Sequence, residues 1–133
     1  MFTNRRTRIE DFENIKANKY FKENEKELLI NAYGYYKAET LLKGDEIIAI
    51  ATFREFHPRL YSSGFIVKEN VSVSELKVIK AFVKHVISNQ NADYVYSECV
   101  TCEVRDRFHR FLGFEVEKDL DTFKKWKFKG LLY

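Results

Sequence analysis

The sequence predicts an α/β protein in which helices and strands alternate along the chain. Apolar residues make up 45% of the 133 residues and aromatic residues 16%, which is enough for a packed core. Segments with the period of amphipathic helices alternate with short runs rich in β-branched and aromatic residues. The sequence contains no linker or low-complexity tract between them. We therefore expect one domain over residues 1–133.

The charge and composition exclude several classes of function. With 23 basic and 20 acidic residues, the net charge of +3 is low for a dedicated nucleic-acid-binding protein. No run approaches the ~18 apolar residues of a membrane helix, and residues 1–6 lack the apolar stretch of a signal peptide. Two cysteines without an export signal favour a reducing compartment. We expect a cytoplasmic protein, located in the host cytoplasm or the virion if a phage encodes it.

The N-terminal third predicts one strand and two helices. Residues 2–8 form a short strand, and a helix follows from Asp11 with Phe12 and Ile15 on one face. Asn24 and Glu27 have the spacing of a capping box for the second helix. The apolar residues that follow at helical spacing are Leu28, Leu29, Ala32, Tyr33 and Tyr36.

The middle of the chain predicts three strands and a long helix. Residues 39–43 and 46–56 form a hairpin around Gly44–Asp45, and His57–Pro58 ends its second strand. Residues 61–68 form the third strand. A helix over residues 72–89 opens with a capping box formed by Ser72 and Glu75. Its apolar stripe consists of Leu76, Ile79, Phe82, Val83, Val86 and Ile87.

The C-terminal third predicts a strand, a helix and a final pair of strands. The strand covers residues 93–100, and the helix covers residues 101–112 and ends at Gly113. The last two strands cover residues 114–118 and 122–128. The helix residues that we expect to point inward are Val104, Phe108, Phe111 and Leu112. The predicted order is β-α-α-β-β-β-α-β-α-β-β.

This order resembles the fold of the GNAT N-acetyltransferases over nearly the whole chain. The clearest local match is Arg107-Phe108-His109-Arg110-Phe111-Leu112-Gly113-Phe114, which resembles the last helix of the family and the Gly-Phe step that follows it. The segment Arg6–Phe12 resembles the first strand and helix, and Leu42–Ala49 the second and third strands. The resemblance implies an α/β, GNAT-like fold with a mixed central sheet.

The same resemblance implies transfer of an acetyl group from acetyl-CoA to an amine. In the family two parallel strands part to accept the pantetheine arm, and a helix N-terminus holds the diphosphate. The resemblance gives Glu98 as the base, with Glu69 as second choice. It gives His109 as the acid, at a position where the family often has tyrosine. The cofactor-binding residues carried over in this way are Val67, Lys68, Ser72, Val73, Ser74 and Arg105.

The loop from Lys68 to Glu75 departs from the family pattern. It contains no glycine and is several residues shorter than the family's loop. A capping box from Ser72 to Glu75 would occupy the N–H groups that a phosphate needs, and Glu69 would add like charge. We therefore expect acetyl-CoA binding to be weak or lost. The alternative is a catalytically silent GNAT fold with a protein partner, similar to short GNAT-like proteins of tailed bacteriophages, including virion components.

Two other residue groups suggest different functions. Cys99 and Cys102 have the spacing of a redox pair, although small core residues are the commoner use of such cysteines. No second paired-ligand motif accompanies them, so we expect no zinc site. A basic surface could bind an acidic partner, but interleaved acidic residues favour an ordinary solvated face, with His109 half-exposed on it. The basic residues concerned are Arg105, Arg107, His109, Arg110, Lys124, Lys125, Lys127 and Lys129.

Overall fold

The structure, a computed structural model, describes residues 1–131 and confirms the predicted order of elements. The elements are β1 (Phe2–Arg6), α1 (Ile9–Asn14), α2 (Glu23–Asn31), β2 (Lys37–Lys43), β3 (Glu46–His57), β4 (Leu60–Val67), α3 (Val73–Ser88), β5 (Tyr94–Val100), α4 (Glu103–Leu112), β6 (Phe114–Asp119) and β7 (Phe123–Phe128). Residues 132 and 133 of the predicted domain lie outside the described residues. Within residues 1–131, none of the helices has the length and apolar character needed to cross a membrane.

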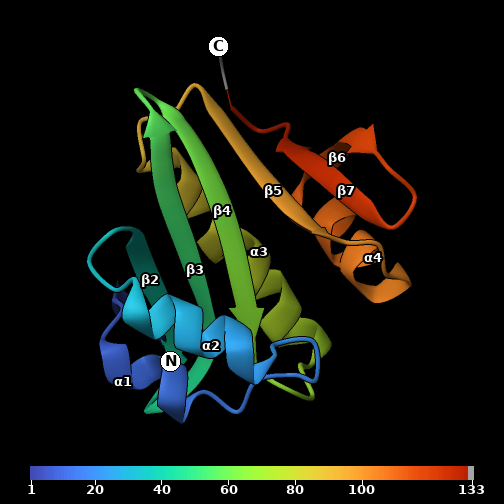
Figure 1. Cartoon of the computed structure of the whole chain (residues 1–133). Coiled ribbons are helices and arrows are strands. Elements are labelled where there is room, and N and C mark those ends of the chain that lie inside the picture. Colours follow the sequence, from blue (N-terminus) through green and yellow to red (C-terminus); the bar gives the residue numbers. More distant parts are fainter. Residues whose placement is uncertain (132–133) are drawn as a thin grey trace.

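The described strands form one seven-stranded sheet in the order β1-β2-β3-β4-β5-β7-β6. All neighbours are antiparallel except β4 and β5, which are parallel, so the predicted mixed sheet is confirmed. Helices α1 and α2 cover one face of the sheet, and α3 and α4 cover the other (Figure 1). The parallel pair requires a crossover connection, which α3 supplies.

Strands β4 and β5 pair over only three positions and then part. The register joins Leu60 to Tyr94, Tyr61 to Val95 and Ser62 to Tyr96, after which the strands diverge (Figure 1). The main-chain groups on the inner edge of β4 must then find other partners. Residues 16–18 bond to the end of that edge, where Asn18 N donates to Val67 O at 3.0 Å and Glu69 N donates to Lys16 O at 2.8 Å.

Two apolar clusters hold the helices to the sheet. The larger lies beneath α3 and α4 and includes the stripe predicted for the long helix except Leu76, which is half-buried and lines a cavity. The smaller joins Phe12 and Ile15, the predicted inward residues of α1, to Ile50 and Ile66 of the sheet. Each cluster uses one face of the sheet, because successive side chains of a strand point to opposite faces.

Two predicted helix ends are confirmed. The Ser72 hydroxyl accepts a hydrogen bond from Glu75 N at 3.2 Å, and the Glu75 carboxylate accepts one from Ser72 N at 2.9 Å. Gly113 ends α4 with a φ of 104°, a left-handed conformation that favours glycine.

The capping box predicted for α2 is wrong. The helix begins at Glu23, its N-cap is Lys22, and no side chain bonds to the first turn. Asn24 therefore lies inside the helix. Because Leu29 and Ile30 make the contacts with the sheet, Leu28 faces solvent, and Tyr36 lies beyond the end of the helix.

The inward face predicted for α4 is also partly wrong. Leu112 is buried, but Val104 is 45% exposed and Phe111 is 37% exposed. The helix buries Asp106 and His109 instead. Both polar side chains have partners inside the protein, since Asp106 bonds to Lys124 of β7 and His109 bonds to Ser97 of β5. These partners compensate for the lost contact with water, which makes a polar inward face possible.

We predict that the buried Asp106–Lys124 pair contributes strongly to stability. Lys124 Nζ lies 2.6 Å from Asp106 Oδ2, and both side chains are nearly inaccessible to solvent. Burial raises the carboxyl pKa of Asp106, but the Lys124 ammonium, the Cys102 backbone and the Arg110 charge together lower it further than burial raises it. Asp106→Asn should leave the ammonium unpaired and lower the free energy of unfolding by about 3–5 kcal/mol, measured by urea denaturation.

The exposed pair on the same helix provides a control. Arg107 lies 3.8 Å from Glu103, and both side chains are largely exposed. Glu103→Gln should therefore change the free energy of unfolding by less than about 1 kcal/mol. Equal effects of the two substitutions would contradict the stabilising role of the buried pair.

Candidate functional site

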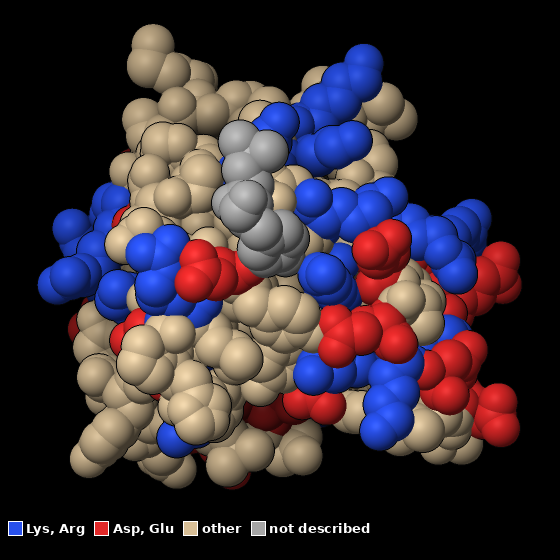
Figure 2. All heavy atoms as spheres, turned by 90° about the horizontal axis from the view of Figure 1, so that it is seen from above, with Lys and Arg blue, Asp and Glu red and all other residues tan. Residues whose placement is uncertain are grey.

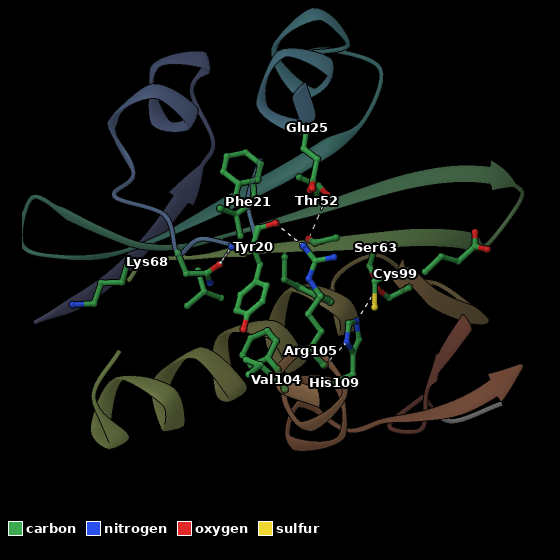
Figure 3. A pocket seen from close by; sticks show the side chains of 18 of the residues that line it. Tyr20, Phe21, Glu25, Thr52, Ser63, Lys68, Cys99, Val104, Arg105 and His109 are labelled. Carbon is green, nitrogen blue, oxygen red and sulfur yellow. Dashed lines mark hydrogen bonds between the residues drawn. The ribbon is translucent and has the colours of Figure 1, made fainter. Parts of the chain in front are cut away.

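The parted strands β4 and β5 enclose a cavity of about 460 Å³ (Figure 3). Its walls come from both strands, from α4, from α2 and from the segment that joins α1 to α2. Most of the surface is apolar, and a few polar groups converge on it. The polar residues are Asn18, Glu25, Thr52, Ser63, Lys68, Ser97, Glu98, Arg105 and His109. An apolar cavity with few polar groups is typical of a small-molecule site.

His109 is fixed at the end of the cavity where the strands part. Its Nδ1 lies 2.8 Å from the Arg105 carbonyl oxygen, and its Nε2 lies 2.9 Å from the Ser97 hydroxyl. The ring stacks on Trp126, with centroids 5.0 Å apart and planes 10° apart, and meets the edge of Phe114. Hydrogen bonds and ring contacts together fix the orientation of the imidazole.

The tautomer of His109 follows from these partners. A carbonyl oxygen only accepts, so Nδ1 carries the proton and Nε2 accepts from the Ser97 hydroxyl. Burial lowers the pKa of His109, against the opposing influence of the Arg105 carbonyl and the Asp106 charge. The ring is therefore neutral at pH 7, with a basic nitrogen turned to Ser97. With only 6% of its surface exposed, His109 is not the half-exposed surface residue that one interpretation of the sequence predicted.

The two predicted bases lie away from the imidazole. Glu98 lines the cavity and is exposed, but it follows Ser97 on the strand and so projects from the opposite face. Glu69 is exposed beyond the end of β4, with its amide bonded to Lys16. A third carboxylate, Glu25 of α2, points into the cavity towards Thr52 (Figure 3). The cavity thus has acidic groups on the α2 side and a basic nitrogen on the α4 side.

Arg105 lines the cavity and joins α4 to the segment between α1 and α2. Its Nη2 donates to the Tyr20 carbonyl at 2.5 Å, and its guanidinium lies 5.6 Å from the centre of the Tyr20 ring. Figure 3 shows Arg105 reaching from α4 to the main chain of Tyr20, whose ring descends towards Val104. Arg105, one of the predicted cofactor-binding residues, is therefore engaged in contacts within the protein.

The side chains of the predicted cofactor loop bond to one another and to its main chain. Lys68 Nζ lies 2.9 Å from Glu75 and 3.4 Å from Glu46, and it points away from the cavity (Figure 3). The Ser72 amide and the Lys68 ammonium lower the pKa of Glu75 to about 2, so its carboxylate is charged at neutral pH. Ser74 bonds to the Ser72 hydroxyl at 3.1 Å.

The remaining cofactor-binding candidates separate into two places. Val67 is buried in the cavity wall, and its carbonyl accepts from Asn18. Val73 is exposed on the first turn of α3. The structure therefore brings Val67 and Lys68 to one end of the cavity and leaves the first turn of α3 beside it, capped by its own side chains.

The two cysteines differ in environment. Cys99 lines the cavity, and burial raises the pKa of its thiol. Cys102 is the N-cap of α4, and the amide of Arg105 lowers the pKa of its thiol. Both are free thiols. Among residues 1–131, no group of three or more His, Cys, Asp or Glu side chains is arranged to hold a metal ion.

The predicted basic surface does not form as one face. Lys124 and His109 are buried, and Arg105 is tied to Tyr20. Figure 2 shows acidic and basic side chains intermingled on the side of the molecule that carries β6, β7 and α4. Cancelling charges of this kind agree with the interpretation of an ordinary solvated surface.

Sequence reasoning missed three residues of the site, namely Ser97, Tyr20 and Glu25. Ser97 gave one usable signal, since it is a polar residue on the same strand face as Val95, which is fully buried. Tyr20 lies in the segment between α1 and α2, and Glu25 lies in α2; both line the cavity because these parts of the chain pack over the gap, which no local pattern predicts.

Comparisons with known proteins identify the fold. No family model matches the chain, and no curated protein matches its sequence. Solved structures match over nearly the whole chain. An acetyltransferase described as a GNAT family member from Desulfovibrio desulfuricans shares 16% identity, with a TM-score of 0.74 and 96% of each chain covered.

Two further structures have named activities. The ribosomal-protein-S18-alanine N-acetyltransferase of Escherichia coli shares 12% identity, with a TM-score of 0.72 and 100% of both chains covered. The N-acetyltransferase PseH of Campylobacter jejuni, in complex with acetyl-coenzyme A, shares 11% identity, with a TM-score of 0.67 and 98% of this chain and 100% of that chain covered. Identities this low establish the fold alone. The chain therefore has the GNAT N-acetyltransferase fold.

Proposed function

We propose that the chain binds an acyl-CoA thioester, acetyl-CoA in the simplest case, and transfers the acyl group to an amine. One observation carries this proposal, namely the parting of β4 and β5 over a cavity that contains a buried, neutral His109. A gap between two parallel strands offers main-chain donors and acceptors to an extended amide chain such as pantetheine. The fold and the complex of PseH with acetyl-coenzyme A support this assignment.

The inner edge of β4 has suitable groups for the pantetheine amides. Lys68 N donates to Ile48 O on β3, so alternation turns the N–H groups of Phe65 and Val67 towards the gap. The segment that bonds to Val67 O and Glu69 N covers only the far end of this edge. We place the thioester between this edge and Ser97, where a carbonyl oxygen can accept from a main-chain N–H.

We assign the proton transfers to groups on opposite sides of the cavity. Glu98 and Glu25 attract a cationic amine, and Glu98 removes its proton. His109 serves as the acid for the departing thiolate only after it has gained a proton, because its Nε2 is unprotonated at rest. Glu98 leaves the amine neutral, and His109 takes the further proton that the attacking group loses when it bonds to the acyl carbon and passes that proton to the thiolate.

The contacts of Glu75 favour weak binding of the diphosphate, and they support a second candidate function. The capping box and the Lys68–Glu75 pair occupy the groups that would receive the phosphates. If the phosphates cannot displace these contacts, our second candidate is a catalytically silent protein that binds a protein partner as a component of a phage virion.

Isothermal titration with acetyl-CoA, and with CoA for comparison, tests the proposed function. We expect sub-millimolar binding of acetyl-CoA and release of CoA thiol when primary amines are added. Glu98→Gln should slow that release while binding persists, because the charge removed acts on the amine. The absence of heat at millimolar acetyl-CoA would rule out the enzyme and support the interaction component.

Glu75→Gln should tighten CoA binding by roughly three- to tenfold, because one negative charge is removed and the Lys68 ammonium is released. Glutamine preserves the capping box, so the helix start should survive. The same titration measures the effect. Glu46→Gln is the matched control, because Glu46 also pairs with Lys68 but lies outside the first turn of α3. Unchanged or weaker affinity in Glu75→Gln would show that the diphosphate lies elsewhere.

The free energy of unfolding should fall as the pH is lowered from about 7.5 to about 5.5. The pKa of His109 is lower in the folded protein than the ~6.5 of an unfolded chain, so the unfolded state binds the proton first. The loss is at most about 1.4 kcal/mol for each pH unit in this window. Urea denaturation followed by the fluorescence of Trp126, the single tryptophan, measures it.

His109→Gln is the control for this titration. The variant should be less stable at pH 7.5 but should lose the pH dependence between about 7.5 and 5.5. An identical slope in the two proteins would show that His109 is not the buried neutral group that the proposed proton transfers require.

A further inference from the structure

Ser97 lies one residue beyond the last pair of the two parallel strands. Tyr96 is the last residue of β5 paired with β4, and Ser97 follows where the strands have begun to part. Its side chain is 4% exposed and lines the cavity. A ligand in the gap therefore meets this hydroxyl at the closed end of the site.

The hydroxyl of Ser97 has the partner that a nucleophilic serine needs. It donates to Nε2 of His109 at 2.9 Å, and Nδ1 of the same ring is held at 2.8 Å by the Arg105 carbonyl. Nucleophile, base and orienting group thus stand in the order that activates serine in covalent catalysis. A carbonyl takes the orienting place that a carboxylate has in the common triads.

Two aromatic rings hold the imidazole of His109 in the orientation in which Nε2 faces Ser97. Trp126 stacks on one face, and Phe114 meets the ring edge with centroids 5.6 Å apart. This packing prevents the ring from turning away from Ser97. The dyad is distinct from Glu98, which projects from the other face of β5.

We propose that Ser97 and His109 form a nucleophile–base dyad that accepts the acyl group as an ester on Ser97. This rests on the proposed function in the choice of an acyl thioester as donor. Ser97 Oγ attacks the thioester carbonyl, its proton passes to His109 Nε2, and the C–S bond breaks. The thiolate takes that proton and leaves as free thiol. An amine or water then attacks the ester, the C–Oγ bond breaks, and the proton returns to Ser97 through His109.

Acid-quenched peptide mass spectrometry tests the dyad with two acyl donors. The protein is mixed with acetyl-CoA or, separately, with p-nitrophenyl acetate, an activated ester that needs no CoA site. We expect one acetyl group on Ser97 with each donor and a burst of p-nitrophenolate with the ester. Ser97→Ala should abolish both signals, and His109→Gln should slow acylation by roughly a hundredfold or more.

Two further variants keep the result interpretable. Ser62→Ala removes a β4 serine that lies beside Tyr96 and outside the cavity lining, and it should acylate like the parent protein. Ser97→Cys covers the case in which Ser97→Ala does not fold. It should carry the acetyl group as a thioester that neutral hydroxylamine removes, whereas the ester of the parent protein resists the same treatment.

The two donors separate failure of the dyad from failure of the proposed function. Acylation of Ser97 by the ester, without binding or acylation by acetyl-CoA, would reject CoA as the donor and still support the dyad. Binding of acetyl-CoA without acetyl on Ser97 from either donor would overturn the dyad. Acetyl found on Cys99 or another residue in place of Ser97 would overturn it as well.

Discussion

The site depends on the early end of the pairing between β4 and β5. A parallel pair that continued to the end of both strands would satisfy its main-chain groups internally and leave no gap. Here the pairing stops at Ser62 and Tyr96, so the edge of β4 becomes available. The segment around Ala17 bridges to Lys68 and closes the far end of the gap. The cavity, its walls and the position of Ser97 all follow from that interruption.

The elements of the fold could be predicted because their signals are local. The stripe of α3, its capping box and the turn at Gly44–Asp45 each lie within a few residues of sequence. One local signal was wrong, the capping box predicted at Asn24, which lies inside α2. The errors in α4 arose where distant residues decide. A polar face of α4 is stable only because Lys124 and Ser97 meet Asp106 and His109 across the core. Periodicity alone cannot identify such partners, so it assigned those positions to the surface.

The site was less predictable than the fold for the same reason. His109 was indicated by the family resemblance. Ser97 was missed because its one signal, a polar residue on the buried face of a strand, does not identify a partner on α4. The resemblance gave Glu98, on the strand before the last helix, as the base. On a strand, however, neighbours project from opposite faces, so the residue before it is the one that meets His109. The departure at the cofactor loop was visible because a capping box is a local pattern, which the contacts of Ser72 and Glu75 reproduce.

In the function that we propose, affinity and chemistry depend on different ends of this cavity. At one end Lys68 is paired with Glu75 and Glu46, and the Lys68 and Glu75 side chains are largely inaccessible to solvent, so a diphosphate must break these ion pairs to bind there. At the other end Ser97 and His109 are buried among aromatic rings, where a hydrogen bond is stronger and its geometry is fixed. Weak anchoring of the nucleotide is therefore compatible with a well-ordered reactive end. Loss of phosphate contacts alone does not imply loss of catalysis in this fold.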